Sequence, residues 1–202
     1  MEKNDLLISL RRVGFSESII SAFANIKREE FIPEEYRQMA YHDVALPIGN
    51  NQTISQPYTI ATMLSLLHVK KGQKILEIGS GSGYVLALLS NIVGETGTVF
   101  GIEIIKNLAD NSKKVLKSYR NVRIYNQDGK DGLKFHSPFD RILISAACEE
   151  VPKAILDQVK PGGMLVAPIG SSQQQSITAI KKHESFSIKV KEIPGFVFVR
   201  FV

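Results

Sequence analysis

The sequence predicts an α/β protein built on a doubly wound, mostly parallel β-sheet. Three observations lead to this fold class. Short apolar strand candidates alternate with helix candidates through the middle of the chain, a glycine-rich turn joins one strand to the next helix, and from residue 176 onward the chain contains only strand candidates. Strands that alternate with helices need crossover connections, which give a parallel sheet covered on both faces. Consecutive strands at the end of the chain predict an antiparallel edge.

The first 70 residues precede this alternation. Apolar residues recur at helical spacing around residues 6–10 and 19–23, which predicts two helices. A proline at position 33 then interrupts the helical pattern. Residues 41–57 are rich in Pro, Gly, Asn and Gln and predict an extended, irregular segment, followed by a helix over about residues 58–67.

The remainder supplies the sheet and its covering helices. We expect strands at residues 74–78, 98–103, 122–126, 139–145 and 164–168, and helices at 84–93, 108–119 and 152–158. The final strands are expected at residues 176–182, 185–190 and 196–202. The lysine-rich helix within residues 106–117 is interpreted as a solvated face.

Composition narrows the classes of function. The 202 residues suit a single domain, and the formal net charge of +5 falls short of the dense basic surface of a dedicated nucleic-acid-binding protein. Cys148 is the only cysteine, so no internal disulfide forms and a reducing, cytoplasmic compartment is expected. The sequence shows no signal peptide and no apolar run long enough to span a bilayer. The four histidines lack the spacing of metal ligands, so no metal is expected.

The segment Glu77-Ile78-Gly79-Ser80-Gly81-Ser82-Gly83 follows a predicted strand and opens a predicted helix. The dinucleotide-binding fingerprint G-x-G-x-x-G does not fit, because its last glycine falls on Tyr84 or Leu86. The spacing E-x-G-x-G-x-G is instead that of methyltransferases that use S-adenosylmethionine (AdoMet). We therefore predict that Glu77, Gly79, Ser80, Gly81 and Gly83 bind this cofactor, although the loop alone could be a simple strand–helix turn.

Two further strand ends support a nucleoside site. Glu103 ends the next strand, where a carboxylate can accept hydrogen bonds from both ribose hydroxyls. Asp128 and Gly129 follow the third strand. Aspartate can accept a hydrogen bond from the adenine amine, and glycine leaves room for the base. Each feature alone has a plain explanation, but the carboxyl ends of parallel strands meet at one edge of the sheet.

The segment Tyr41–Pro57 resembles protein-L-isoaspartate (D-aspartate) O-methyltransferases, whose Y-x-D-x-x-L-P-I-G and Q-T-I-S-x-P motifs stand here almost intact. The resemblance extends to the segments 28–33, 76–84, 128–129, 138–142, 146–147, 151–152 and 156–163. It implies a Rossmann-like class I methyltransferase fold, with a helical and substrate-loop region in residues 1–70 and the Rossmann-like core in residues 71–202.

The resemblance also implies a reaction. The family transfers the methyl group of AdoMet, which becomes S-adenosylhomocysteine, to the α-carboxylate of L-isoaspartyl and also D-aspartyl residues in damaged proteins. A carboxylate is ionised at pH 7, so the reaction needs positioning more than a strong base. The motif places the active-site serine at Ser55, with Thr53 and Ile54 beside the methionine part of the cofactor. Ser55 could also cap the following helix.

Three departures from the family pattern affect the site. Asn51 stands where the family usually has glycine, and Gln127 precedes Asp128 where glycine is common. The usual F-V-P-L stretch is Phe198-Val199-Arg200-Phe201 here, and the sequence ends at Val202. These changes concern efficiency and peptide specificity more than AdoMet binding.

Three alternatives remain open. The chain could methylate a different peptide carboxylate, or be a catalytically weak AdoMet-binding protein that acts by interaction. A nucleic-acid methyltransferase is disfavoured, because the Asn/Asp-Pro-Pro-aromatic motif is absent. We expect no nucleic-acid or membrane partner, and a monomer, since a damaged segment of another protein must reach an open cleft.

Overall fold

A computed structural model describes residues 1–171 and 173–199. Two α-helices come first, α1 (Lys3–Val13) and α2 (Glu17–Asn25), then the 3₁₀ helices η1 (Arg28–Phe31) and η2 (Glu34–Met39). The strands are β1 (Leu46–Gly49), β2 (Gln52–Ile54), β3 (Lys74–Ile78), β4 (Thr98–Glu103), β5 (Val122–Asn126), β6 (Phe139–Ile144), β7 (Val159–Gly170), β8 (Gln175–Lys182) and β9 (Ser187–Phe196). The other helices are α3 (Pro57–Leu67), α4 (Tyr84–Val93), α5 (Lys106–Val115), η3 (Lys134–His136) and α6 (Lys153–Leu156).

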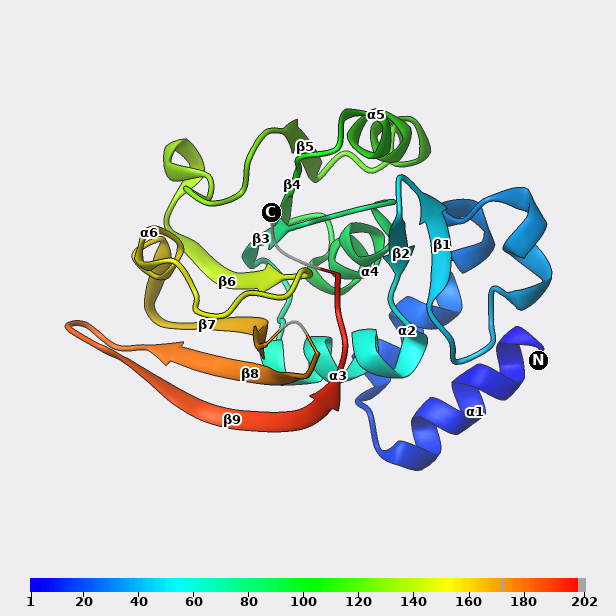
Figure 1. Cartoon of the computed structure of the whole chain (residues 1–202), viewed down its shortest axis with the longest axis horizontal. Helices are drawn as coiled ribbons and strands as arrows, with labels where there is room; N and C mark the ends of the chain where they lie inside the picture. Colours follow the sequence, from blue (N-terminus) through cyan, green and yellow to red (C-terminus); the bar gives the residue numbers. More distant parts are fainter. Residues whose placement is uncertain (172, 200–202) are drawn as a thin grey trace.

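The main sheet has seven strands in the order β5-β4-β3-β6-β7-β8-β9 (Figure 1). Strands β3 to β7 run parallel to one another, while β8 pairs antiparallel with both β7 and β9. From β3 the chain first adds β4 and β5 on one side and then returns to add β6 and β7 on the other side, so the strand order reverses between β3 and β6. The predicted parallel sheet with an antiparallel edge is confirmed, and the reversal beside β3 is where open α/β sheets bind ligands.

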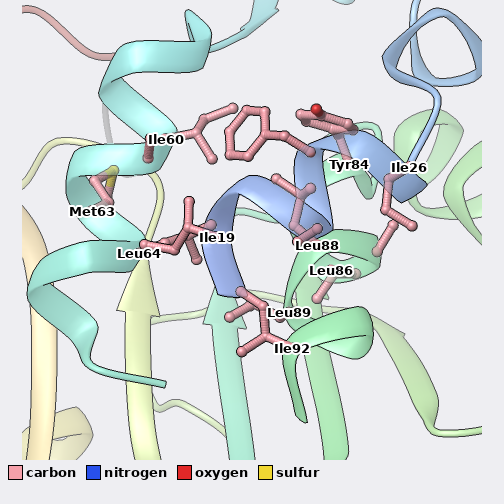
Figure 2. Close-up of a cluster of buried hydrophobic side chains, with 14 of the residues drawn as sticks. Ile19, Ile26, Ile60, Met63, Leu64, Tyr84, Leu86, Leu88, Leu89 and Ile92 are labelled. Carbon is pink, nitrogen blue, oxygen red and sulfur yellow. The ribbon is translucent and has the colours of Figure 1, made fainter. Parts of the chain in front are cut away.

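Alternate residues of each strand point to opposite faces of the sheet, where they form two apolar layers. On one face, Ile75 and Leu143 contact the layer formed with α1 to α4 and the end of α5. On the other face, Leu76 and Ile142 pack with α6 and the segment after β5. Figure 2 shows the first layer, where side chains from α2, α3 and α4 meet, among them Ile19, Ile60, Met63, Leu64, Tyr84 and Leu88.

Several predicted boundaries differ from the structure, and two differences are large. The segment 41–57, expected to be irregular, contains the hairpin of β1 and β2. In place of the strands expected at 185–190 and 196–202 there is one strand, β9, which runs through Pro194 and ends at Phe196, so residues 197–199 of the second expected strand are not in a strand. Pro194 lies on the outermost strand, where its missing N–H leaves no ladder position unfilled. Residues 200–202 of the expected last strand lie outside the described residues.

Candidate functional site

A cleft of about 960 Å³, including its open mouth, lies at the carboxyl ends of β3 and β4. The glycine-rich loop and Glu103 form one side, and the β1–β2 hairpin faces them. Nine of the eleven predicted site residues line this cleft, all except Gly83 and Asp128, so the topology gathers most of them at one edge of the sheet.

The glycine-rich loop has a backbone that only glycine adopts readily. Gly81 and Gly83 have φ values of 53° and 86°, in the left-handed region. A Cβ on Gly83 would lie 2.8 Å from Leu116 Cδ1, and one on Gly81 would lie 3.2 Å from Ile48 Cδ1. Glycine at these positions therefore lets α4 start against α5 and lets the hairpin lie close to the loop. Gly83 itself is outside the cleft wall, whereas Gly79, Ser80 and Gly81 line it.

Glu103 is held rigidly at the end of β4. Its side chain is 5% exposed, and its two carboxylate oxygens accept hydrogen bonds from the backbone N–H groups of Gly81 at 2.7 Å and Ile105 at 2.9 Å. Each carboxylate oxygen has a second lone pair, so both can also accept from a ligand hydroxyl. The arrangement suits a ribose and couples the ribose site to the glycine-rich loop.

Glu77 and Ser80 each carry a buried polar atom without a hydrogen-bond partner, Glu77 Oε2 and Ser80 Oγ. Both residues line the cleft. Burial raises the pKa of Glu77 to about 8, the nearby carboxylate of Glu103 adds to this rise, and the Ser145 hydroxyl, which donates to Glu77 Oε1 at 2.7 Å, opposes it. Unsatisfied buried groups are costly, so their position in the cleft fits a ligand with polar, positively charged groups.

Of the two predicted residues after β5, only Gly129 lines the cleft, and Asp128 does not. Gly129 is buried and lines the cleft. Asp128 is exposed and does not belong to the lining; its carboxylate accepts the backbone N–H of Lys130 at 2.9 Å and lies 3.7 Å from Lys130 Nζ. The neighbouring Gln127 amide donates to the carbonyl of Gly132 at 3.3 Å. In this conformation Asp128 shapes the turn and does not face the cleft.

The β1–β2 hairpin brings Thr53, Ile54 and Ser55 to the cleft wall. Its turn residues Asn50 and Asn51 both have positive φ, 53° and 56°. Asparagine tolerates this region better than most residues, so Asn51 can replace the usual glycine. Helix α3 starts at Pro57 with Gln56 in the capping position, so Ser55 does not cap it.

Arg28, which the sequence did not single out, anchors the hairpin. The side chain is 0% exposed. Its guanidinium donates to the carbonyls of Ser55 at 2.9 Å and Val44 at 3.2 Å, and it lies 5.5 Å from the ring centre of Tyr84. Burial lowers the pKa of Arg28 to about 10. A single buried cation thus joins both flanks of the hairpin to the first residue of α4.

The C-terminal segment completes the wall. Val199 lines the cleft and accepts a hydrogen bond from the backbone N–H of Ala147 at 2.7 Å. The backbone N–H of Phe198 donates to Oε1 of the buried Gln175 at 2.8 Å. Arg200 and the end of the predicted F-V-R-F stretch lie outside the described residues. Sequence reasoning also missed Ser145. This residue directly follows β6, just as Glu103 ends β4, so the argument from strand ends could have identified both residues.

Comparison with known proteins places this site in a class. The sheet order, with a glycine-rich loop and an acidic strand end at the reversal, is that of class I methyltransferases. A family model described as protein-L-isoaspartate(D-aspartate) O-methyltransferase matches residues 1–202. The protein-L-isoaspartate O-methyltransferase of Methanothrix thermoacetophila is 39% identical over 204 aligned positions, which cover 100% of this chain and 95% of the relative. The protein-L-isoaspartate O-methyltransferase 2 of Archaeoglobus fulgidus is 38% identical, and the alignment covers 100% of this chain and 92% of the relative.

Solved structures agree. A protein-L-isoaspartate O-methyltransferase superposes with a TM-score of 0.91 at 30% identity; the match covers 98% of this chain and 65% of that one. A structure from Plasmodium falciparum, assigned to the same enzyme and in complex with S-adenosyl-L-homocysteine, superposes with a TM-score of 0.86 at 24% identity, over 100% of this chain and 99% of that one. The chain belongs to the protein-L-isoaspartate(D-aspartate) O-methyltransferase family.

Proposed function

We propose that this chain transfers the methyl group of AdoMet to the α-carboxylate of L-isoaspartyl residues in damaged proteins. The observation that carries the proposal is the placement of Ser55, at the end of the hairpin motif, on the same cleft wall as the glycine-rich loop and Glu103. When bound, AdoMet supplies a methyl group on a positively charged sulfur. Substrate carboxylate oxygen and methyl carbon form the new bond, the sulfur–carbon bond breaks, and its electron pair stays on sulfur, so no proton is transferred.

Different residues of the cleft bind different parts of AdoMet in this proposal. Glu103 holds the two ribose hydroxyls, and Glu77 with Ser80 satisfies the polar groups of the methionine part. Thr53 and Ile54 pack beside that part, and Gly129 leaves room for the base. Asp128 is proposed to accept from the adenine amine, which requires its side chain to turn away from Lys130.

Ser55 orients the substrate carboxylate. A hydroxyl can donate one hydrogen bond to the carboxylate oxygen that does not react, which fixes the other oxygen in line with the methyl carbon. A base in this place would serve no purpose, because the nucleophile is already ionised. The surrounding apolar residues, among them Ile54, Ile60 and Met63, exclude water from the reacting atoms.

The wider setting is also proposed. The described chain forms one domain, in which the region 1–70 builds the hairpin side of the cleft and 71–202 builds the sheet side. We expect a cytoplasmic monomer whose partners are damaged proteins and not nucleic acids. No helix in the described part of the chain is long and apolar enough to cross a bilayer.

Methyl transfer from labelled AdoMet to three otherwise identical peptides, with L-isoaspartate, D-aspartate or L-aspartate at one position, tests the function. Base-labile label on the isoaspartyl peptide but not on the L-aspartyl peptide is the expected result, and the D-aspartyl peptide defines the breadth of specificity. AdoMet binding without label on any peptide would refute the repair function and point to a different carboxylate or to a binding role.

The Ser55→Ala variant tests the assignment within the site. We expect the turnover rate to fall about 100-fold or more with the AdoMet dissociation constant unchanged, because the hydroxyl acts on the substrate carboxylate. Ser118→Ala is the matched control, since it removes an exposed hydroxyl outside the cleft wall. An equal loss of AdoMet affinity in Ser55→Ala would make Ser55 a structural residue.

A further inference from the structure

The positive charge of the chain is concentrated in one short segment. Residues 111–127 contain five basic residues, Lys113, Lys114, Lys117, Arg120 and Arg123, and no acidic residue. Five equals the formal net charge of the whole chain, +5, so the other 185 residues hold twenty basic and twenty acidic residues. The segment covers the end of α5 and the whole of β5.

The fold gathers four of these cations around a single depression. Lys113, Lys117, Arg120 and Arg123 line it together with the buried Leu116 and the half-buried Tyr119. The Arg123 guanidinium donates to the carbonyls of Arg120 at 2.8 Å and Val122 at 3.1 Å, which fixes its direction. We call this surface the basic depression.

In the described part of the chain, no salt bridge compensates these cations. The acidic groups that face the region are Asp110, which pairs with Lys106 at 2.5 Å, and Glu30, which pairs with Lys27 at 3.9 Å. Four cations that face one hollow without internal compensation repel one another, and an acidic partner relieves this repulsion.

The basic depression lies within reach of the cleft. Helix α5 joins the two, because Leu108 lines the cleft and Leu116 lines the basic depression. Eight residues correspond to about 12 Å along a helix at 1.5 Å per residue. An extended polypeptide covers that distance in about four residues, at roughly 3.3 Å each.

We propose that the basic depression docks an acidic segment of the substrate protein that lies outside the residue that is methylated. This inference rests on the proposed function and adds a recognition site to it. A polypeptide fits better than a nucleic acid, because Tyr119 is the only aromatic residue in the lining and its ring is half-buried, which leaves no platform for stacked bases.

Steady-state kinetics with paired isoaspartyl peptides test the proposal. One peptide carries three glutamates starting five residues from the isoaspartate, and the other carries glutamines there. The test variant combines Lys113→Glu, Lys117→Glu and Arg120→Glu. The matched control combines Lys70→Glu, Lys71→Glu and Lys191→Glu, which reverses three exposed lysines elsewhere and changes the net charge equally.

At low ionic strength we expect the unaltered enzyme and the control to favour the acidic peptide by about three- to thirtyfold in kcat/KM, mainly through KM, since each exposed ion pair contributes modestly. The preference should shrink as salt is raised to 0.5 M, where the screening length is only about 4 Å. In the test variant the preference should disappear, while kcat on the glutamine peptide stays unchanged because the cleft is intact.

Three results would overturn the inference. The unaltered enzyme could show no preference for the acidic peptide, the test variant could retain it, or both triple variants could lose it equally, which would make it a net-charge effect. Binding of a fluorescent single-stranded oligonucleotide that only the test variant loses, with peptide kinetics unaffected, would assign the surface to nucleic acid instead. Absence of methylation on the glutamine peptide by the unaltered enzyme would refute the proposed function and is distinguishable from all of these.

Discussion

Glu77 makes the stability of the protein depend on pH in a direction opposite to that of most carboxylates. Its side chain is 1% exposed at the end of β3, and burial raises its pKa from 4.5 to about 8. Between these two values the folded protein holds a proton that the unfolded chain has released. The contribution of Glu77 to the free energy of unfolding is therefore fully present below pH 4.5. It declines as the pH rises through the folded-state pKa near 8.

The Glu77→Gln variant removes this dependence. The amide keeps an oxygen that can accept from the Ser145 hydroxyl, but it does not titrate. A gap from 4.5 to about 8 corresponds to about 5 kcal/mol at 1.36 kcal/mol per pH unit. Without AdoMet, we expect the variant to gain about 4 kcal/mol in free energy of unfolding over the unaltered protein between pH 5 and pH 9, because the titration of Glu77 has already begun at pH 5.

Urea denaturation at five pH values measures the difference directly. Glu184→Gln is the control, because it removes an exposed carboxylate in the same way. A pH-independent difference between Glu77→Gln and the unaltered protein would refute the reasoning. The same argument predicts that AdoMet binds the unaltered protein more tightly at pH 8 than at pH 6, since the bound cation favours the ionised carboxylate, and that Glu77→Gln loses this trend.

Three further outcomes follow from the site. Glu103→Ala should weaken AdoMet binding by about 1.5–3 kcal/mol, because two hydroxyls lose a charged acceptor; calorimetry checks this, and an unchanged dissociation constant would contradict the ribose assignment. Arg28→Lys should lower kcat about tenfold with AdoMet affinity retained, because one ammonium does not span both carbonyls, and an equal loss of affinity would show that Arg28 supports the whole cleft. Asn51→Ala should lower the free energy of unfolding by about 1 kcal/mol and Asn51→Gly should not, since only alanine resists positive φ; equal costs in urea denaturation would rule out this account of the turn.

The local pattern predicted the sheet where the chain alternates strongly. Strands β3, β4 and β5 and helix α4 have the predicted bounds, because apolar strands and a glycine-rich turn define them without help from distant residues. The β1–β2 hairpin was missed because its strands are short and its turn is Asn50-Asn51, whose positive φ replaces the more familiar glycine. Strand β9 was divided at Pro194, which only an edge position makes acceptable.

The site was predicted where chemistry coincides with a strand end, and not where it depends on tertiary contacts. Glu103 and the glycine-rich loop follow strands, so their convergence was foreseeable. Arg28 contacts Ser55 across 27 positions of sequence, and no periodicity indicates such a contact. Val199 reaches the cleft only because the chain turns back from β9, and Asp128 faces away from the cleft because a local turn with Lys130 competes for its carboxylate.

The contact between Val199 and Ala147 has a consequence for biosynthesis. A ribosome releases the parallel strands in order, and each can pair as soon as its neighbour has emerged. The cleft wall, however, stays incomplete until residue 199 has left the exit tunnel. Nascent chains that stall after β8 would hold a nearly complete sheet beside an unfinished cofactor site. The ability to hold AdoMet should therefore arise only once residue 199 has emerged.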